Sequence, residues 1–250
     1  MEPSRRCTKG CAFCYNGSNP SGEGAWTADS LVAFLLDCAK NGVEAVSFGG
    51  GEPLEWPEIF DCLTALRGRL FRSLTTNGLK LDDAATLEAL LRAAPDKVHL
   101  SIHAPERAGE VDRALRWTAE LESRGVRSGV NLLVRRSRLS EARAAAARLS
   151  HLGPERLILL PLKGPGDDNP SPAEVASVVQ GPFQSMSCLN GCGKSPRFAS
   201  IDADQRAAWC SYTTTRAPLQ NLDFAGLSRA LDGLGLRPCS EALVRELPAG

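Results

Sequence analysis

The chain has 250 residues, of which 43% are hydrophobic, and its 29 basic residues balance its 29 acidic residues. This length suits one α/β domain with an appendage, and the balanced charge argues against the basic face of a nucleic-acid-binding protein. The sequence contains no apolar run of 18 residues that would span a membrane, and its N-terminus lacks an apolar signal region. Nine cysteines in such a chain indicate metal ligands and free thiols rather than disulfides, so we expect a cytoplasmic protein without nucleic-acid or membrane partners.

Residues 1–6 hold no apolar run, so we expect the first strand of the fold to be very short or missing. Beyond residue 26, helix-like and strand-like patterns alternate. Apolar residues at helical spacing predict helices at residues 27–42, 57–66, 83–93, 106–124 and 140–152. The apolar runs between them predict strands at residues 43–48, 70–76, 97–103, 126–134 and 156–162. This alternation predicts an α/β fold, specifically a partial (β/α) barrel of five or six parallel strands.

The sequence changes character near residue 184, and we expect a barrel domain over residues 1–183 followed by a smaller unit over residues 184–250. Two short strand patterns at residues 197–202 and 206–211 predict a β-hairpin in this unit. A short helix is predicted at residues 224–234.

Three cysteines lie on one short segment near the N-terminus: Cys7, Cys11 and Cys14. A [4Fe–4S] cluster has four iron atoms whose usual protein ligand is thiolate, so three cysteines would leave one iron open. The next cysteine, Cys38, falls in a helical pattern, where it and Cys62 are expected to be buried small hydrophobes. The alternatives are a zinc knuckle, which needs a fourth Cys or His within a few tens of residues, and scattered structural thiols.

A strand pattern at residues 45–48 runs into the sequence Gly-Gly-Gly-Glu-Pro at residues 49–53. Together with the CxxxCxxC spacing of the three cysteines, this segment resembles the radical S-adenosylmethionine (radical SAM) superfamily. The resemblance implies a [4Fe–4S] cluster whose open iron binds S-adenosylmethionine (SAM), with Gly50, Gly51 and Glu52 beside that cofactor. It further implies reductive cleavage of SAM to a radical that takes a hydrogen atom from substrate, and a reductant such as flavodoxin or ferredoxin. An ordinary strand-to-helix turn is the alternative for residues 49–53.

In parallel α/β folds, ligands bind at the carboxyl ends of the strands. This rule selects the strand ends at residues 50–52, 76–77, Ser101 with His103, Asn131 with Arg135, and 162–163. The resemblance implies that Ser101 and Asn131, among these, contact the ribose or the carboxylate of SAM. The resemblance also places Phe13, which precedes the last cysteine of the triplet, near adenine. Arg107 is a weaker candidate for the carboxylate, because an arginine at a helix start is usually solvated.

A general base is expected near the substrate carbon, and the candidates at the strand ends are His103, Arg135 and Lys163. Relatives often carry aspartate near His103, so this histidine could recognise substrate, transfer a proton or be structural. Lys163 precedes a polar loop that could be merely solvated.

The segment after residue 184 is similar to the Twitch and SPASM extensions of radical SAM enzymes, in which a β-hairpin and a helix carry an auxiliary iron–sulfur cluster. Its four cysteines would complete one further [4Fe–4S] cluster, and a structural zinc site is the alternative. These cysteines are Cys188, Cys192, Cys210 and Cys239.

A second cluster would accept an electron from a substrate radical, so the resemblance favours a net oxidation or a crosslink. We expect a radical SAM maturase of a ribosomally made peptide. The alternatives are a radical SAM dehydrogenase of a small carbohydrate-like alcohol, and a non-catalytic iron–sulfur or zinc protein. Because six residues before Cys7 leave no room for a leader-binding domain, a peptide substrate is expected to use a separate carrier or another docking surface.

Overall fold

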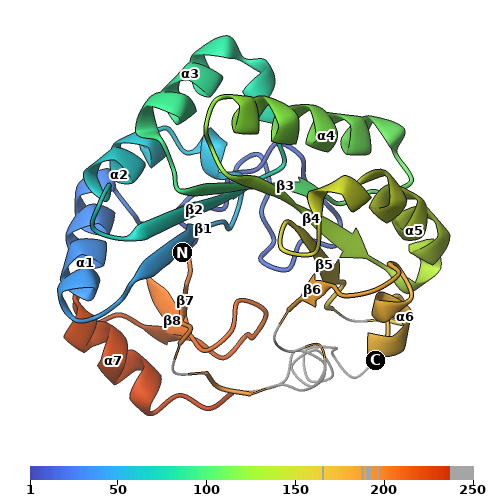
Figure 1. Cartoon of the computed structure of the whole chain (residues 1–250). Coiled ribbons are helices and arrows are strands. Elements are labelled where there is room, and N and C mark those ends of the chain that lie inside the picture. The colour runs from blue at the N-terminus through green and yellow to red at the C-terminus, as the bar shows by residue number, and fades with distance from the viewer. Residues whose placement is uncertain (165, 187–188, 190–192, 196, 237–250) are drawn as a thin grey trace.

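The computed structural model describes residues 1–164, 166–186, 189, 193–195 and 197–236. Six parallel strands form one curled sheet in the order β1-β2-β3-β4-β5-β6, with helices along its outer side (Figure 1). The strands are β1 Ala45–Phe48, β2 Phe71–Thr76, β3 Lys97–Ile102, β4 Ser128–Val134, β5 Leu157–Pro161 and β6 Gln184–Ser185. This arrangement confirms the predicted α/β fold and the partial barrel.

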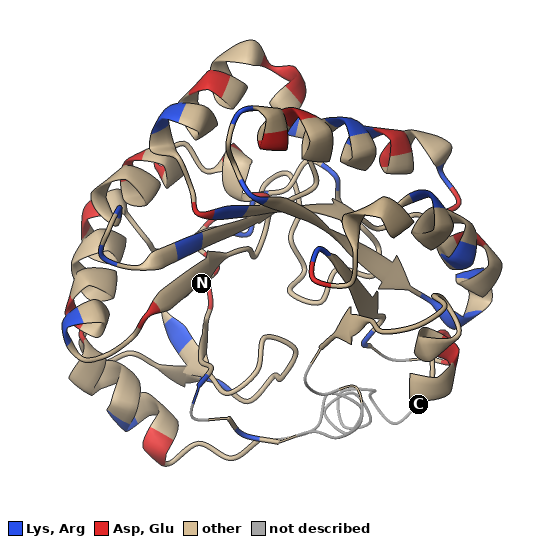
Figure 2. Ribbon diagram, in the orientation of Figure 1, with Lys and Arg blue, Asp and Glu red and all other residues tan. Residues whose placement is uncertain are grey.

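Five of the helices alternate with strands as predicted, and two more follow later in the chain. They are α1 Ala28–Lys40, α2 Ile59–Ala65, α3 Ala84–Ala93, α4 Ala108–Ser123, α5 Leu139–Arg148, α6 Pro172–Ala176 and α7 Phe224–Asp232. Local chemistry explains their starts: Thr27 forms a capping box at α1, and the Asp83 carboxylate accepts the Thr86 amide at α3. Helices α1 to α5 bury apolar residues in the core shared with the sheet, and charges of both signs lie mainly on the helices (Figure 2).

The sixth strand was not recognised in the sequence as a strand. β6 has two residues, Gln184 and Ser185, and pairs in parallel with β5 through Ile158 and Leu159. A strand of two residues is too short to show an alternation of apolar and polar residues, which explains why the sequence pattern predicts only five strands. β6 begins at the first residue of the predicted smaller unit, and the division of the chain after residue 183 stays a prediction.

Residues 1–6 form no regular strand, as expected, but they run along the edge of β1. The Met1 amine donates to the Ser47 carbonyl (2.9 Å), and the Gly49 amide donates to the Met1 carbonyl (3.0 Å). On its other side, the Glu2 amide donates to the Ile201 carbonyl (2.9 Å). The N-terminal segment thus lies between the large sheet and a small second sheet.

The small sheet is antiparallel and has three strands, β7 Ser200–Ile201, β8 Arg206–Ala208 and β9 Ala217–Pro218. The hairpin and the helix predicted for this unit are confirmed, although both hairpin strands are shorter than expected and β9 was missed. Helix α7 docks on α1, where the Phe224 amide donates to the Asp37 carboxylate (2.9 Å). Trp26 adds a further link, since its indole N–H donates to the Asp202 carbonyl (3.0 Å).

The core is continuous between sheet and helices, and it includes the two helical cysteines. Cys38 and Cys62 are 1% and 0% exposed, which confirms that they are packing residues. Burial raises the pKa of each thiol to about 12, so both are inert thiols at neutral pH. In the described part of the chain, no helix combines the length and apolarity needed to cross a membrane.

Candidate functional site

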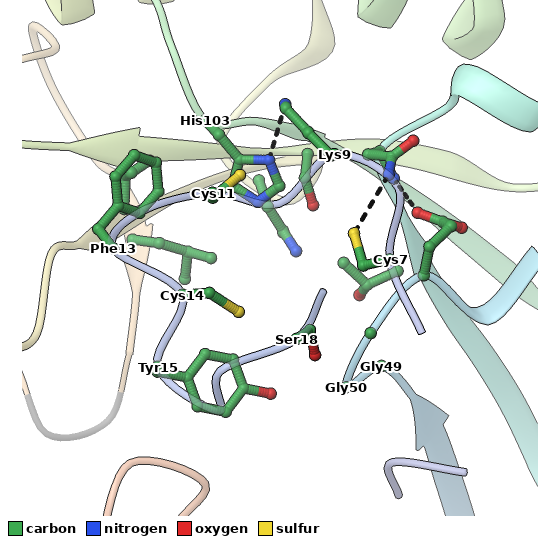
Figure 3. A pocket seen from close by; sticks show the side chains of 18 of the residues that line it. Cys7, Lys9, Cys11, Phe13, Cys14, Tyr15, Ser18, Gly49, Gly50 and His103 are labelled. Atoms are coloured by element: carbon green, nitrogen blue, oxygen red, sulfur yellow. Dashed lines mark hydrogen bonds between the residues drawn. The ribbon is translucent and has the colours of Figure 1, made fainter. Parts of the chain in front are cut away.

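A pocket of about 290 Å³ opens at the carboxyl ends of the parallel strands (Figure 3). It is where the strand-end rule places a ligand site. Its walls come from residues 7–18, the turn at 49–52, the ends of β2 to β5, and a single residue of the small unit, Tyr212. The structure therefore brings together segments that are widely separated in the sequence.

All three cysteines of the N-terminal triplet line this pocket, and each is partly exposed. Within the described residues, no three Cys, His, Asp or Glu side chains lie close enough together to ligate one metal ion. Thiolate is the usual protein ligand of an iron–sulfur cluster, and three thiols in one pocket match three of its corners. Cys7, Cys11 and Cys14 are thus suited to hold a [4Fe–4S] cluster.

Two buried carboxylates clamp the loop between the first two cysteines. Glu55, 8% exposed, accepts the amide of Thr8 (3.0 Å to Oε2) and its hydroxyl (2.7 Å to Oε1). Glu110, 6% exposed, pairs with the Lys9 ammonium at 2.8 Å. Sequence analysis missed both acids, because η1 (Pro53–Glu55) and the first turn of α4 are places where an acid is unremarkable.

The Lys9 side chain also determines the protonation state and the tautomer of His103. The Lys9 ammonium lies 3.0 Å from His103 Nδ1, and because an ammonium only donates, this nitrogen must accept (Figure 3). Burial, and then the positive charge of Lys9, lower the pKa of His103 to about 4. Burial alone would raise the pKa of Glu110, but the hydrogen bond and charge of Lys9, together with the His103 and Ala104 amides, hold that pKa below its ordinary value. His103 is therefore neutral, with its proton on Nε2.

Two glycines of the turn at 49–52 leave space for the N-terminal segment of the chain. A Cβ on Gly51 would lie 2.2 Å from the Arg6 carbonyl oxygen, and one on Gly50, whose φ is +94°, would lie 2.6 Å from Glu2 Cβ. Gly49 differs, because a Cβ there would meet no atom within 4 Å. Gly50 and Gly51 thus admit the N-terminal segment, and all three glycines line the pocket.

Glu52 closes the turn and is 3% exposed. Its Oε1 accepts from the Thr76 hydroxyl (2.6 Å) and the Leu54 amide (3.1 Å), and its Oε2 accepts from the Asn77 amide (2.8 Å). Burial raises the pKa of Glu52 to about 7, despite these three donors. The carboxylate thereby fastens β2 to the turn, and its Oε2 retains one acceptor position. Asn77, one of the strand-end residues selected from the sequence, lines the pocket and places its Nδ2 atom 4.0 Å from Cys7 Sγ.

The other predicted cofactor contacts also line the pocket. Ser101 and Asn131 are paired in register on β3 and β4, and Phe13 stands beside them on the cysteine loop. The Phe13 ring lies 5.5 Å from the guanidinium carbon of Arg135. Arg107 is at the N-cap of α4 and does not line the pocket.

The three general-base candidates have different surroundings. Arg135 is not among the lining residues, because its guanidinium is held over Phe13 and by Glu106 at 2.9 Å. His103 lines the pocket with its Nδ1 lone pair directed at Lys9. Lys163 lines the pocket, and no ion pair is found for it within the described residues.

The small unit reaches the pocket through Tyr212, whose ring centroid lies 4.8 Å from that of Tyr15. Tyr15 directly follows Cys14, and its hydroxyl donates to the Glu2 carboxylate (2.8 Å). Of the four C-terminal cysteines, the structure describes Cys210, which is partly exposed two residues before Tyr212. The predicted ligands Cys188, Cys192 and Cys239 lie outside the described residues.

Several curated proteins are similar to this chain over part of its length. A probable GTP 3′,8-cyclase of Methanocella arvoryzae is 32% identical over 104 residues, which are 42% of this chain and 33% of that protein. A PqqA peptide cyclase of Gluconobacter oxydans is 34% identical over 110 residues, which are 43% of this chain and 30% of that protein. The matched segment therefore spans about a third of the length of these relatives.

Solved structures with the same fold match nearly the whole chain. Streptococcus suis SuiB bound to S-adenosylmethionine matches with a TM-score of 0.69 and 17% identity, covering 93% of this chain and 65% of SuiB. The enzyme anSMEcpe with bound AdoMet matches with a TM-score of 0.64 and 14% identity, covering 90% of this chain and 75% of that protein. At such low identity, these matches establish the fold.

The model of the radical SAM superfamily matches residues 1–153, which include the cysteine triplet, the Gly-Glu turn and strands β1 to β4. This match covers more than half of the chain and contains the residues on which the resemblance was based. The chain belongs to the radical SAM superfamily.

Proposed function

We propose that this protein binds a [4Fe–4S] cluster through Cys7, Cys11 and Cys14, binds SAM beside it, and oxidises or crosslinks a peptide. When bound, these cofactors supply a 5′-deoxyadenosyl radical that takes a hydrogen atom from substrate. The observation that carries the proposal is that the three thiols, the Gly-Glu turn and the polar strand ends line one pocket.

Different residues of the chain would hold the cluster and the separate groups of SAM. Glu55 and Glu110 fix the segment between Cys7 and Cys11 through Thr8 and Lys9, so this part of the cysteine loop is held by two separate elements. The free position on Glu52 Oε2 suits the ammonium group of SAM, which donates hydrogen bonds. Ser101 and Asn131 supply polar contacts, and Phe13 supplies an aromatic face for adenine.

Lys163 is the general-base candidate best placed to meet substrate. The basic Nδ1 of His103 already accepts from Lys9, and the guanidinium of Arg135 is held by Glu106 and over Phe13 outside the pocket lining. The Lys163 side chain lines the pocket at the end of β5. We therefore assign Lys163 to contact and position the substrate, and a role as base would require its neutral amine.

A peptide substrate is supported by the relatives and the structural neighbours. They include a PqqA peptide cyclase, SuiB bound to the precursor peptide SuiA, and anSMEcpe bound to a Cp18Cys peptide. The GTP 3′,8-cyclases among the relatives support a small-molecule substrate as the second candidate. The carbohydrate-like alcohol remains a prediction that neither group of relatives supports.

An auxiliary cluster in the C-terminal unit is the second part of the proposal. Cys210 lies close in sequence to Tyr212, so a cluster ligated there would stand near the pocket and could accept an electron from substrate. Two clusters require about eight iron atoms per chain and one requires about four. The Cys210→Ala variant should retain SAM cleavage but lose substrate oxidation.

The test is anaerobic reconstitution with iron and sulfide, followed by SAM, dithionite and one class of substrate per reaction. Formation of 5′-deoxyadenosine is measured by mass spectrometry in the presence of mixed short peptides, GTP or polyols. The proposal predicts cleavage that peptides stimulate above the uncoupled rate, with peptide products two hydrogen masses lighter. Stimulation by GTP alone would replace the peptide assignment, and absence of 5′-deoxyadenosine in every reaction would contradict the activity itself.

A further inference from the structure

His99 is a buried polar residue that the pocket description leaves without a role. It lies on β3, is 7% exposed and does not line the pocket. Its register partner on β4 is Gly129, and a Cβ at Gly129 would lie 2.7 Å from His99 Nε2. The absence of a side chain at Gly129 thus makes room for the imidazole ring between the two strands.

One contact connects His99 to the site. His99 Nδ1 lies 2.8 Å from the side-chain Oδ1 of Asn131, two residues beyond Gly129 on β4. Asn131 does line the pocket, whereas His99 stands behind it. His99 therefore contacts a cofactor-binding candidate without lining the pocket itself.

The direction of this hydrogen bond follows from what remains unpaired. His99 Nε2 is buried and has no hydrogen-bond partner within the described residues. A buried N–H without an acceptor is rarer in proteins than a buried acceptor without a donor, so the proton belongs on Nδ1. Burial also lowers the pKa of His99 to about 4, which keeps the ring neutral. His99 Nδ1–H thus donates, and Asn131 Oδ1 accepts.

This direction determines what Asn131 can offer to a ligand. With Oδ1 engaged by His99, the free end of the amide is Nδ2, for which no acceptor is found in the described part of the chain. A primary amide nitrogen only donates. Asn131 therefore presents N–H donors to the pocket, which suit the carboxylate or the ribose oxygens of SAM.

We propose that His99 is a positioning residue that fixes the orientation of the Asn131 amide and thereby sets the affinity of this protein for SAM. The inference rests on the proposed function in one respect, namely that SAM occupies this pocket. It deepens the assignment by placing a determinant of SAM affinity behind the wall of the site.

The test measures SAM binding by equilibrium dialysis on the reconstituted holoprotein without reductant, so that no turnover enters the result. His99→Leu removes the donor and should weaken SAM binding about tenfold, the value of one ordinary hydrogen bond. His99→Asn keeps an amide N–H near the position of Nδ1 and should restore the affinity to within about threefold. In an Asn131→Ala background, His99→Leu should weaken binding no further, because nothing remains to be oriented.

Melting temperatures of all variants accompany the binding data, since His99 is buried. Equal losses in His99→Leu and His99→Asn, or a His99→Leu loss that persists unchanged without the Asn131 amide, would overturn the inference. Unchanged affinity in both Asn131→Ala and His99→Leu would overturn it as well, while leaving SAM binding intact. Failure of the wild-type holoprotein to bind SAM would instead overturn the proposed function, so the two failures are distinguishable.

Discussion

Replacing Glu110 by glutamine removes one charge from the ion pair that clamps the cysteine loop. The Lys9 and Glu110 side chains are 13% and 7% exposed, and their charged atoms lie 2.8 Å apart. At an effective dielectric constant of about 20, two charges at this distance attract by about 6 kcal/mol, much of which offsets their desolvation. Removing one partner leaves the other charge buried, which costs about 3–5 kcal/mol. Glutamine keeps the shape and can still accept the His103 and Ala104 amides, so the change isolates the charge.

The assay is anaerobic urea unfolding followed by tryptophan fluorescence, together with iron content after reconstitution. We expect Glu110→Gln to lower both, because the loop that carries the three thiols is no longer held. Glu120→Gln on the same helix is the matched control, since Glu120 forms an exposed pair with Arg124 at 3.5 Å and should change stability by less than about 0.5 kcal/mol.

A double variant with Lys9→Met completes the thermodynamic cycle. Because it leaves no unpaired charge, it should lose clearly less stability than the sum of the two single variants. The reasoning would be refuted by additive losses, or by a Glu110→Gln variant that is no less stable than the Glu120→Gln control.

Three further predictions follow from the site. Cys7→Ala should abolish formation of 5′-deoxyadenosine in the reconstitution assay, whereas Cys62→Ala should retain it and cost roughly 1 kcal/mol of stability; equal loss in both would mean that the ligands are misassigned. Gly51→Ala should lower the melting temperature by about 5 °C or more relative to Gly49→Ala, because its Cβ would overlap a carbonyl oxygen of the N-terminal segment; equal melting temperatures would contradict this. The folded state holds the pKa of His99 at about 4, below its unfolded value of about 6.5, so the unfolded chain binds more protons in this window. The wild type should therefore lose roughly 3 kcal/mol relative to His99→Asn as pH falls from 6.5 to 4, in unfolding measurements on both proteins; a difference independent of pH would show that the ring is not buried in its neutral form.

The sequence predicted those features that local pattern encodes. Long apolar runs and helical spacing determine the strands and helices up to β5, and the cysteine triplet is a spacing along the chain itself. The strands β6 and β9 have two residues each. Such short strands are defined by hydrogen bonds to the neighbouring strand and have no sequence pattern of their own.

The supporting contacts of the site depend on tertiary structure, which the sequence pattern does not encode. Glu55 meets Thr8, and Glu110 meets Lys9, only after the sheet has curled and brought distant segments together. His99 reads simply as part of an apolar strand, and its partner Asn131 lies on the next strand. Many of the residues that line the pocket could therefore be predicted, but the residues that hold them in place could not.

The placement of residues 1–6 has a consequence for the stability of the protein on storage. An end strand of a sheet is a template for intermolecular pairing, and here the free side of β1 is covered by the N-terminal segment. The same short segment leads directly into Cys7 and is fastened to the small unit by the Arg5–Asp204 ion pair. When this segment detaches, the edge of β1 is uncovered and Cys7, the proposed cluster ligand, is displaced in the same event. Loss of the iron chromophore and self-association are therefore expected to proceed together on storage.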